Sequence, residues 1–281
     1  MQNTTAAVKY KSWLFTPATH PARFKKAEEV HAGVLIIDLE DAVLPQEREQ
    51  ARNNIINFMR DTSVTTPKAV RINEIESAEF YKDIKMLEDI HLSGSDFDFI
   101  VLPKVTSRNE IDKVNSVLKN SAITSMLIPM IENAPGVESA AEIAQSSKSV
   151  YALMFGAADF TSSINAEITA PIVNYVQYRM LLACYAAGIN TIASPFFILN
   201  NPDELQQEAL FEKHNGFMGK AAIHPAQIDI INRAFSPSEQ EIKWANDVIK
   251  TLTTGAAVLN NAMIDEAMTR KARGILDSSI N

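Results

Sequence analysis

The sequence contains a single cysteine, Cys184, among 281 residues. It also lacks any run of about eighteen uncharged apolar residues. One thiol cannot form an internal disulfide, and Cys184 lies in a helix-like apolar segment, YRMLLACYAAG, which is typical of a buried structural thiol. The amino-terminal residues MQNTTAAVKYKSW contain no apolar core of a signal peptide. We therefore expect a cytoplasmic protein that neither is secreted nor spans a membrane.

Positive charge is scarce as well. The chain has 26 Lys and Arg against 34 Asp and Glu, which gives a formal net charge of −8. Proteins that bind nucleic acids neutralise phosphates with clustered Lys and Arg. No such cluster is evident, so we expect no nucleic-acid partner, and an anionic ligand would need a local basic site.

A glycine-rich G-x-G-x-x-G turn is also absent, because the first apolar run continues into TPATHPARF. Its absence disfavours an open, doubly wound sheet that binds a dinucleotide. The sequence does contain recurring short apolar runs, each followed by a turn and a helical segment: residues 12–18, 34–40, 68–73, 99–105, 125–132, 150–159, 190–196 and 219–224. Apolar strands that alternate with helices predict an α/β fold with a parallel sheet, and this number of units favours a TIM-type (β/α)8 barrel.

We expect the barrel to be one catalytic domain of residues 1–235. Residues 236–281 are too short for an independent domain, and their spacing predicts a long helix, a break at Thr254 and Gly255, and a second helix. We expect this C-terminal helical extension to pack over the barrel mouth or to reach a neighbouring subunit as a lid.

Acidic residues close several of the predicted strands. Catalytic groups of TIM barrels come from the carboxyl ends of strands. Asp38 and Glu40 should point the same way, because side chains alternate along a strand. Carboxylates without clustered His or Cys suit a hard cation, Mg²⁺ or Mn²⁺, and not zinc. We expect Glu132 and Asp159 to be the ligands; the alternative is that they cap helices or pair with surface cations.

Two basic residues, Arg71 and Lys104, lie near the carboxyl ends of the third and fourth predicted strands. Arg71 has apolar neighbours on both sides and should point into the barrel, where a guanidinium needs an anion. That anion is either a structural partner, Asp38 or Glu40, or a substrate carboxylate. Lys104 closes the fourth strand in VLPKV, where a class I aldolase would carry a Schiff-base lysine. Beside the carboxylates, an ion-pairing or orienting role is favoured.

Seven segments, in order, resemble the successive motifs of the CitE-like family of the HpcH/HpaI aldolase group: SWLFTPATHPARFKKA, IIDLEDAV, VRIN, LPKV, IPMIENAPGV, MFGAADF and KAAIHPAQI. That family includes the citrate lyase β subunit, malyl-CoA lyase and citramalyl-CoA lyase. The resemblance covers nearly the whole chain. It implies a TIM barrel that assembles as a homotrimer or hexamer and that cleaves or condenses 3-hydroxyacyl-CoA thioesters with Mg²⁺.

The resemblance also implies roles for residues at the strand ends. Glu132 and Asp159 correspond to the two metal ligands, and Arg71 to the residue that grips the substrate carboxylate. Glu40 and Asp41 correspond to the acidic pair of the family's DLED segment, which hydrogen-bonds water around the metal.

Further roles follow from the same resemblance. Arg23 and Lys26 correspond to basic residues near the CoA phosphates, and His224 and Pro225 to the turn beside the nucleotide. Asp265, in AMIDEAMTRKA, corresponds to an aspartate that enters a neighbouring subunit's active site as the acid/base. Without the resemblance, Asp265 would be interpreted as an exposed helix-capping acid.

The implied reaction removes the substrate's hydroxyl proton, expels an acetyl-CoA enolate from a small keto acid and protonates that enolate. Citramalyl-CoA, which gives acetyl-CoA and pyruvate, is favoured over malyl-CoA. The alternatives are a citrate lyase β subunit that acts on a citryl thioester of acyl carrier protein, a CoA-independent keto-acid aldolase and an idle assembly subunit. The sequence departs from the family's pattern at Ala18, Asn133 and Ala193, where glycine, threonine and aspartate are common.

Overall fold

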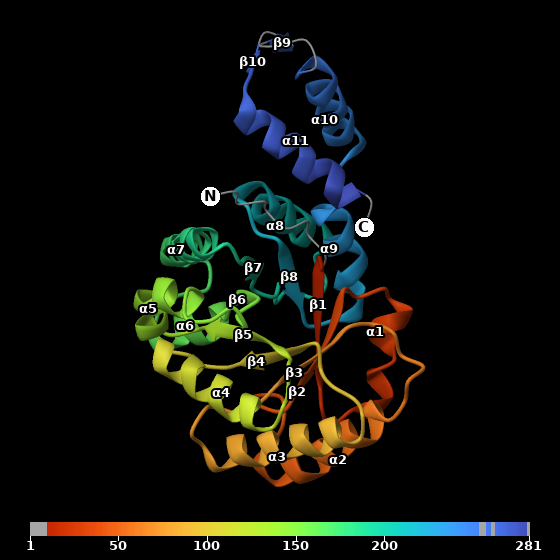
Figure 1. Cartoon of the computed structure of the whole chain (residues 1–281), viewed down its shortest axis with the longest axis vertical. Helices are drawn as coiled ribbons and strands as arrows, with labels where there is room; N and C mark the ends of the chain where they lie inside the picture. Colours follow the sequence, from red (N-terminus) through yellow and green to blue (C-terminus); the bar gives the residue numbers. More distant parts are fainter. Residues whose placement is uncertain (1–9, 253–256, 260–261, 280–281) are drawn as a thin grey trace.

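The structure, a computed structural model, describes residues 10–252, 257–259 and 262–279. Its centre is a closed barrel of parallel strands that follow one another in chain order (Figure 1). The strands are β1 Ser12–Pro17, β2 Val34–Asp38, β3 Lys68–Arg71, β4 Phe99–Leu102, β5 Met126–Ile131, β6 Ala152–Phe155, β7 Asn190–Ala193 and β8 Gly219–Ala222. The predicted fold is confirmed. Each strand ends earlier than predicted, because its last predicted residues leave the sheet at its carboxyl edge.

Helices surround the barrel and connect successive strands (Figure 1). They are α1 Lys26–Glu29, α2 Arg48–Met59, α3 Ala78–Leu92, α4 Arg108–Asn120, α5 Ala134–Ala144, α6 Ala157–Ser163, α7 Pro171–Ala187, α8 Pro202–Asn215 and α9 Ile228–Phe235, with short 3₁₀ turns η1 Pro21–Arg23, η2 Pro45–Glu47 and η3 Pro225–Gln227. Local sequence explains where they begin. Proline opens α7 and α8, and Ser107 with Glu110 forms a capping box at α4.

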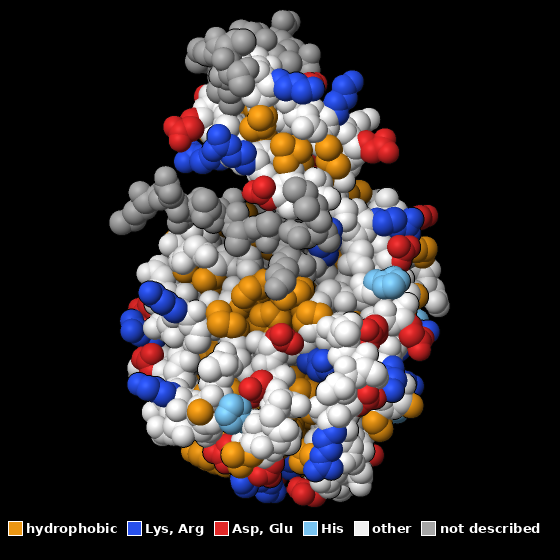
Figure 2. Space-filling view, turned by 45° about the vertical axis from the view of Figure 1, so that its right-hand side comes forward, with side chains coloured by type: hydrophobic (Ala, Val, Ile, Leu, Met, Phe, Trp, Pro, Cys, Tyr) orange, Lys and Arg blue, Asp and Glu red, His pale blue; other side chains and the backbone are white. Residues whose placement is uncertain are grey.

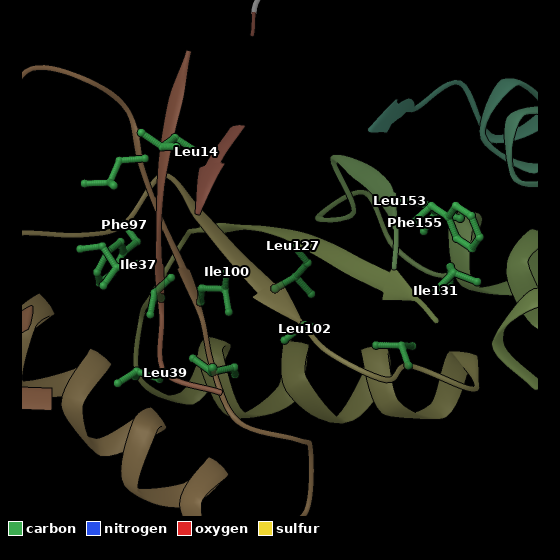
Figure 3. Close-up of a cluster of buried hydrophobic side chains, with 14 of the residues drawn as sticks. Leu14, Ile37, Leu39, Phe97, Ile100, Leu102, Leu127, Ile131, Leu153 and Phe155 are labelled. Atoms are coloured by element: carbon green, nitrogen blue, oxygen red, sulfur yellow. The ribbon is translucent and has the colours of Figure 1, made fainter. Parts of the chain in front are cut away.

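Side chains of each strand alternate between two cores. In β2, Val34 and Ile36 belong to the cluster inside the barrel, whereas Leu35 and Ile37 belong to the cluster between the barrel and its helices. Figure 3 shows the outer cluster, with Ile37, Leu102 and other side chains directed from the strands toward the helices. Residues 38 and 40 continue the inward series, so the alternation brings polar side chains to the barrel's carboxyl edge. We call this edge the barrel mouth.

Cys184 lies fully buried in the outer core, and burial raises the pKa of its thiol to about 11. The expected structural role of this cysteine is therefore confirmed. In the described parts of the chain, no helix is both long and apolar enough to cross a bilayer. The cytoplasmic location stays a prediction.

The C-terminal extension consists of α10 Glu239–Leu252, an antiparallel hairpin of β9 Ala257–Leu259 and β10 Ala262–Ile264, and α11 Glu266–Ser279. The sequence predicted helices on either side of a break and missed the hairpin. Thr254 and Gly255, the predicted break, lie outside the described residues. The two helices pack on each other around a small core that includes Ala245, Val248 and Ala272. Short strands of this kind give too little periodicity to be separated from a helix by pattern alone.

The extension leaves the barrel at the end opposite to the mouth (Figure 1). Ser236, just after α9, accepts a hydrogen bond from the ammonium of Lys11 at 3.0 Å, and Lys11 directly precedes β1. Lys213, near the end of α8, forms an ion pair of 2.9 Å with Glu241 of α10. These contacts lie at the amino ends of the strands, so the extension does not cover the mouth of its own barrel.

Candidate active site

Arg71 is the centre of a buried charge network at the barrel mouth. Its Nε and Nη2 each donate to one carboxylate oxygen of Asp38, both at 2.6 Å. Its Nη1 lies 3.1 Å from Glu40 Oε2, an ion pair without the alignment of a hydrogen bond, and 3.4 Å from Asp41. Burial lowers the pKa of Arg71, but Asp38, Glu40 and Asp41 together raise it, so the guanidinium stays charged. The sequence left Asp38 and Glu40 open as structural partners of Arg71. The paired hydrogen bonds make Asp38 the main partner.

Glu132 is a buried carboxylate with one free oxygen. It directly follows β5, and only 2% of its surface is exposed. Oε1 accepts a hydrogen bond of 2.6 Å from the backbone N–H of Lys104, whereas Oε2 has no hydrogen-bond partner among the described residues. Burial raises the pKa of Glu132 to about 7, with Asp159 and Glu40 adding to the rise and Arg71 opposing it. Such an oxygen needs a proton or a cation.

Gly156 was missed as a functional residue by the sequence analysis. A Cβ built on it would lie 2.5 Å from Oε2 of Glu132, so a side chain here would occupy the place of that carboxylate. Gly156 directly precedes α6 and lines the pocket at the mouth. The signal in the sequence was the glycine in MFGAADF, next to the predicted ligand Asp159.

A pocket of about 370 Å³ opens beside these residues at the barrel mouth. Asp38, Asp41, Arg71 and Asp159 bring charge to its wall, and much of the remainder is apolar, including Phe15, Met130, Met154, Phe155, Phe197 and Ile223. Arg71 also lies over the ring of Phe15, 5.2 Å from its centroid. Arg71 is the only Lys, Arg or His among the described residues that line this pocket.

The carboxylates fit a magnesium ion. Asp159 lies exposed in the first turn of α6 and lines the pocket, and its charge acts on Glu132, whose Oε2 has no partner. In the described parts of the chain, no cluster of three or more His, Cys, Asp and Glu is arranged to hold a metal. Mg²⁺ needs no such cluster, because it commonly takes one or two protein carboxylates and completes its octahedron with water and substrate oxygens. The assignment of Glu132 and Asp159 as ligands stays a prediction that this geometry favours.

The residues expected near CoA belong to the segments that follow β1 and β8. Arg23 is exposed in η1, and Lys26 opens the four-residue helix α1, where it pairs with Glu29 at 2.7 Å. His224 is exposed and accepts a hydrogen bond from the Ala226 N–H, while Pro225 opens η3. Because β1 pairs with β8, the loops that follow these strands are neighbours. Their role in CoA binding stays a prediction.

Asp265 lies in the C-terminal extension, far from the mouth of its own barrel. It is exposed, and its Oδ1 accepts a hydrogen bond of 2.9 Å from the Met268 N–H at the start of α11. In this chain it therefore caps a helix, as its bare sequence context suggested. A role in a neighbouring subunit's active site stays a prediction.

Comparisons with known proteins agree with this architecture. A profile of the HpcH/HpaI aldolase/citrate lyase family matches residues 11–225. An L-malyl-CoA/beta-methylmalyl-CoA lyase of Rhodobacter capsulatus is 30% identical over 297 residues, which cover 94% of this chain and 92% of that protein. The mitochondrial citramalyl-CoA lyase of Homo sapiens is 27% identical, and the match covers 92% of this chain and 82% of that protein.

Solved structures are similar over the same range. RipC from Yersinia pestis is 36% identical, with a TM-score of 0.72 over 84% of this chain and 99% of that chain. The protein CitE from Mycobacterium tuberculosis, in complex with magnesium, acetoacetate and coenzyme A, is 27% identical. Its TM-score is 0.82, and the match covers 99% of this chain and all of that one.

Proposed function

The chain belongs to the HpcH/HpaI aldolase/citrate lyase family, and from this premise we propose that it cleaves citramalyl-CoA to acetyl-CoA and pyruvate. Membership makes it a carbon–carbon lyase of the citrate lyase β and malyl-CoA lyase type, Mg²⁺-dependent and acting on acyl-CoA. The proposal concerns the choice among hydroxyacyl thioesters.

The observation that carries this choice is the lining of the pocket. Its only cation among the described residues is Arg71, which suits a keto acid with one carboxylate. Oxaloacetate, the product from a citryl thioester, has a second carboxylate that would face apolar side chains such as Phe15 and Met154, at the cost of its desolvation. The same apolar wall suits the methyl group of pyruvate, and one methyl group in such a pocket is worth about 1–3 kcal/mol.

Malyl-CoA is the second candidate. The relative in Rhodobacter capsulatus that is 30% identical is named as a malyl-CoA lyase. The keto acid from malyl-CoA, glyoxylate, also has a single carboxylate and therefore fits the single guanidinium. It lacks the methyl group and would leave the apolar wall unfilled.

The chain's own residues account for most of the chemistry. Glu132 and Asp159 would hold Mg²⁺, which supplies Lewis-acid polarisation of the keto acid's oxygens when bound. Arg71, which stays charged and is fixed by Asp38, orients the carboxylate and stabilises negative charge on oxygen as the carbon–carbon bond breaks. The substrate's hydroxyl proton passes to a base, the hydroxyl oxygen becomes the keto oxygen of pyruvate, and the electron pair of the broken carbon–carbon bond passes to the thioester as an enolate. The apolar walls keep water from the reacting carbons.

Protonation of the enolate carbon is the role that we propose for Asp265 of a neighbouring protomer. Two observations support a homo-oligomer, trimer or hexamer. The extension points away from its own barrel mouth, so Asp265 has no route to the pocket of the same chain. In addition, α7 exposes large apolar side chains, including Tyr175 and Leu182, which are 53% and 72% exposed. Apart from α7, Figure 2 shows apolar side chains gathered on one face of the barrel.

A panel of CoA thioesters tests the proposed function. Citramalyl-, malyl- and citryl-CoA are assayed with Mg²⁺ and with a chelator, for the wild type and for Asp159→Asn. We expect the highest kcat/KM with citramalyl-CoA, no turnover without the metal and a large loss in the variant. Faster cleavage of citryl-CoA would contradict the substrate assignment, and full activity of Asp159→Asn would contradict the metal site.

A further inference from the structure

Lys104 adopts a backbone conformation that is unusual for its residue type. It follows β4 in a turn, and its φ of 54° lies in the left-handed region that favours glycine. Non-glycine residues in this region are uncommon and concentrate at functional sites, where surrounding contacts hold them. The contacts of Lys104 therefore indicate what the conformation accomplishes.

Both ends of Lys104 contact carboxylates of the candidate site. Its backbone N–H donates to Oε1 of Glu132 at 2.6 Å. Its ammonium donates to Oε1 of Glu40 at 2.6 Å and lies 3.8 Å from Asp41. One residue thus links the carboxylate at the end of β5 with the acidic segment that follows β2.

The neighbouring helix α5 fits closely against this turn. The side-chain amide of Asn133 donates to the carbonyl oxygen of Lys104 at 3.4 Å, and its oxygen accepts from the Gly136 N–H at 2.8 Å. A Cβ on Gly136 would lie 2.4 Å from the carbonyl oxygen of Val105, so only glycine allows this approach. The amino end of α5 therefore stabilises the left-handed turn.

We propose that Lys104 is a positioning residue that selects which oxygen of Glu132 faces the cation and that keeps Arg71 on Asp38. The backbone N–H occupies Oε1, so the partnerless Oε2 is the oxygen left for a metal. The ammonium neutralises Glu40, which otherwise competes with Asp38 for the guanidinium. This inference rests on the proposed metal site at Glu132 and Asp159.

The same contacts oppose a Schiff-base role for Lys104. Its ammonium is held by the carboxylate of Glu40 at 2.6 Å, and a nucleophilic amine has to be unprotonated. The carboxylates around it favour the charged form.

Two substitutions separate the backbone role from the side-chain role. Lys104→Gly removes the ammonium but adopts the left-handed turn freely, whereas Lys104→Val removes the ammonium and, being β-branched, disfavours that turn. Mg²⁺ affinity is measured by calorimetry without substrate. We expect Lys104→Gly to bind Mg²⁺ like the wild type and Lys104→Val to bind it about 10–100-fold more weakly, as when a hydrogen-bond partner of a metal ligand is lost.

The ammonium is tested by kinetics. We expect kcat of Lys104→Gly to fall about 10–100-fold, with KM for the CoA thioester little changed and with recovery in Lys104→Arg. Equal Mg²⁺ affinity in the Gly and Val variants would overturn the backbone role, and unchanged kcat in Lys104→Gly would overturn the side-chain role.

Two further variants complete the design. If Lys104→Val does not fold, Asn133→Ser replaces it. Serine keeps the helix cap with its hydroxyl oxygen but has no side-chain amide nitrogen to reach the Lys104 carbonyl, so unchanged Mg²⁺ affinity there would count against the backbone role. Glu132→Gln tests the proposed metal site itself. If Mg²⁺ binds to it as to the wild type, the metal site is wrong whatever the Lys104 variants do.

Discussion

Gly156 lies between the buried carboxylate of Glu132 and the pocket, and no larger residue fits there. The nearest atom to a Cβ at this position would be Glu132 Oε2, at 2.5 Å. Under about 3 Å, atoms without a bond between them repel strongly, so one of the two side chains would have to move. The importance that we predict for this glycine comes from steric contact with the predicted metal ligand Glu132, since the φ of Gly156 is not in the left-handed region.

The substitution Gly156→Ala should therefore displace Glu132. We expect Mg²⁺ binding and lyase activity to fall by at least about tenfold, because ligand geometry is tightly coupled to metal affinity. Calorimetry and steady-state kinetics measure both. Gly274→Ala in α11 is the matched control, since a Cβ there meets no atom within 4 Å. It should stabilise the helix by about 0.5–1 kcal/mol and leave Mg²⁺ affinity unchanged. Equal Mg²⁺ affinity and equal lyase activity in Gly156→Ala and Gly274→Ala would contradict the steric argument.

At the scale of elements, a buried ion pair joins β8 to α8. The ammonium of Lys220 is fully buried and donates to Glu208 and Glu212 at 2.7 Å each and to the carbonyl of Ser194 at 2.8 Å. The hydroxyl of Ser194 in turn accepts from the N–H of Ala157, the first residue of α6, which carries Asp159. The ion pair therefore connects β8 and the end of β7 with the helices α8 and α6 beside the pocket.

Replacing Lys220 by methionine should leave two carboxylates without their cation. Breaking a buried pair in this way costs about 3–5 kcal/mol. Burial raises the pKa of Glu212 to about 7, with Lys220 opposing the rise and Glu208 adding to it. Without Lys220 the pKa of Glu212 rises further. The stability deficit of the variant is therefore smallest at low pH, where Glu212 is protonated in both proteins, and it grows as pH increases past about 7, where only the wild type stabilises the ionised form.

Urea denaturation at about pH 5.5 and about pH 8 measures this effect. The deficit of Lys220→Met should be larger at the higher pH. The double variant with Glu212→Gln should recover part of it, because the uncompensated charge is gone. A deficit that does not depend on pH would indicate lost packing rather than an unpaired charge.

At the scale of the whole molecule, the active site of one chain is open on the side where a lid is expected. The extension projects from the opposite end of the barrel, with its own small core (Figure 1). A lid from a second copy would close the pocket and bring Asp265 to it. If a lid from a second copy completes each pocket, a variant without the metal ligand and a variant without the acid should restore activity in mixed oligomers.

Asp159→Asn and Asp265→Asn should each be inactive alone. If Asp265 acts across protomers, mixed oligomers contain some pockets in which an intact metal site meets an intact acid. We expect activity above the sum of the separate variants after unfolding and refolding them together, measured as acetyl-CoA release. No gain, with mixed oligomers verified by differently sized tags, would mean that Asp265 acts within its own chain or has no catalytic role.

The sequence by itself determined the barrel and the set of charged residues at its mouth. Strand periodicity is a local property, so eight apolar runs and their alternation predicted the fold, and the parity of residues 34, 36, 38 and 40 predicted inward-facing acids. The acidic motifs and the family resemblance named Arg71, Glu132 and Asp159.

Only the tertiary structure decided how these residues pair. Whether Arg71 bonds Asp38, whether Lys104 turns left-handed to reach Glu132, and whether Gly156 touches that carboxylate all depend on contacts between residues distant in the sequence. The hairpin of the extension and its exit at the far end of the barrel were likewise not predicted. Local patterns specify elements, but the distances between side chains of different strands follow from packing of the whole barrel.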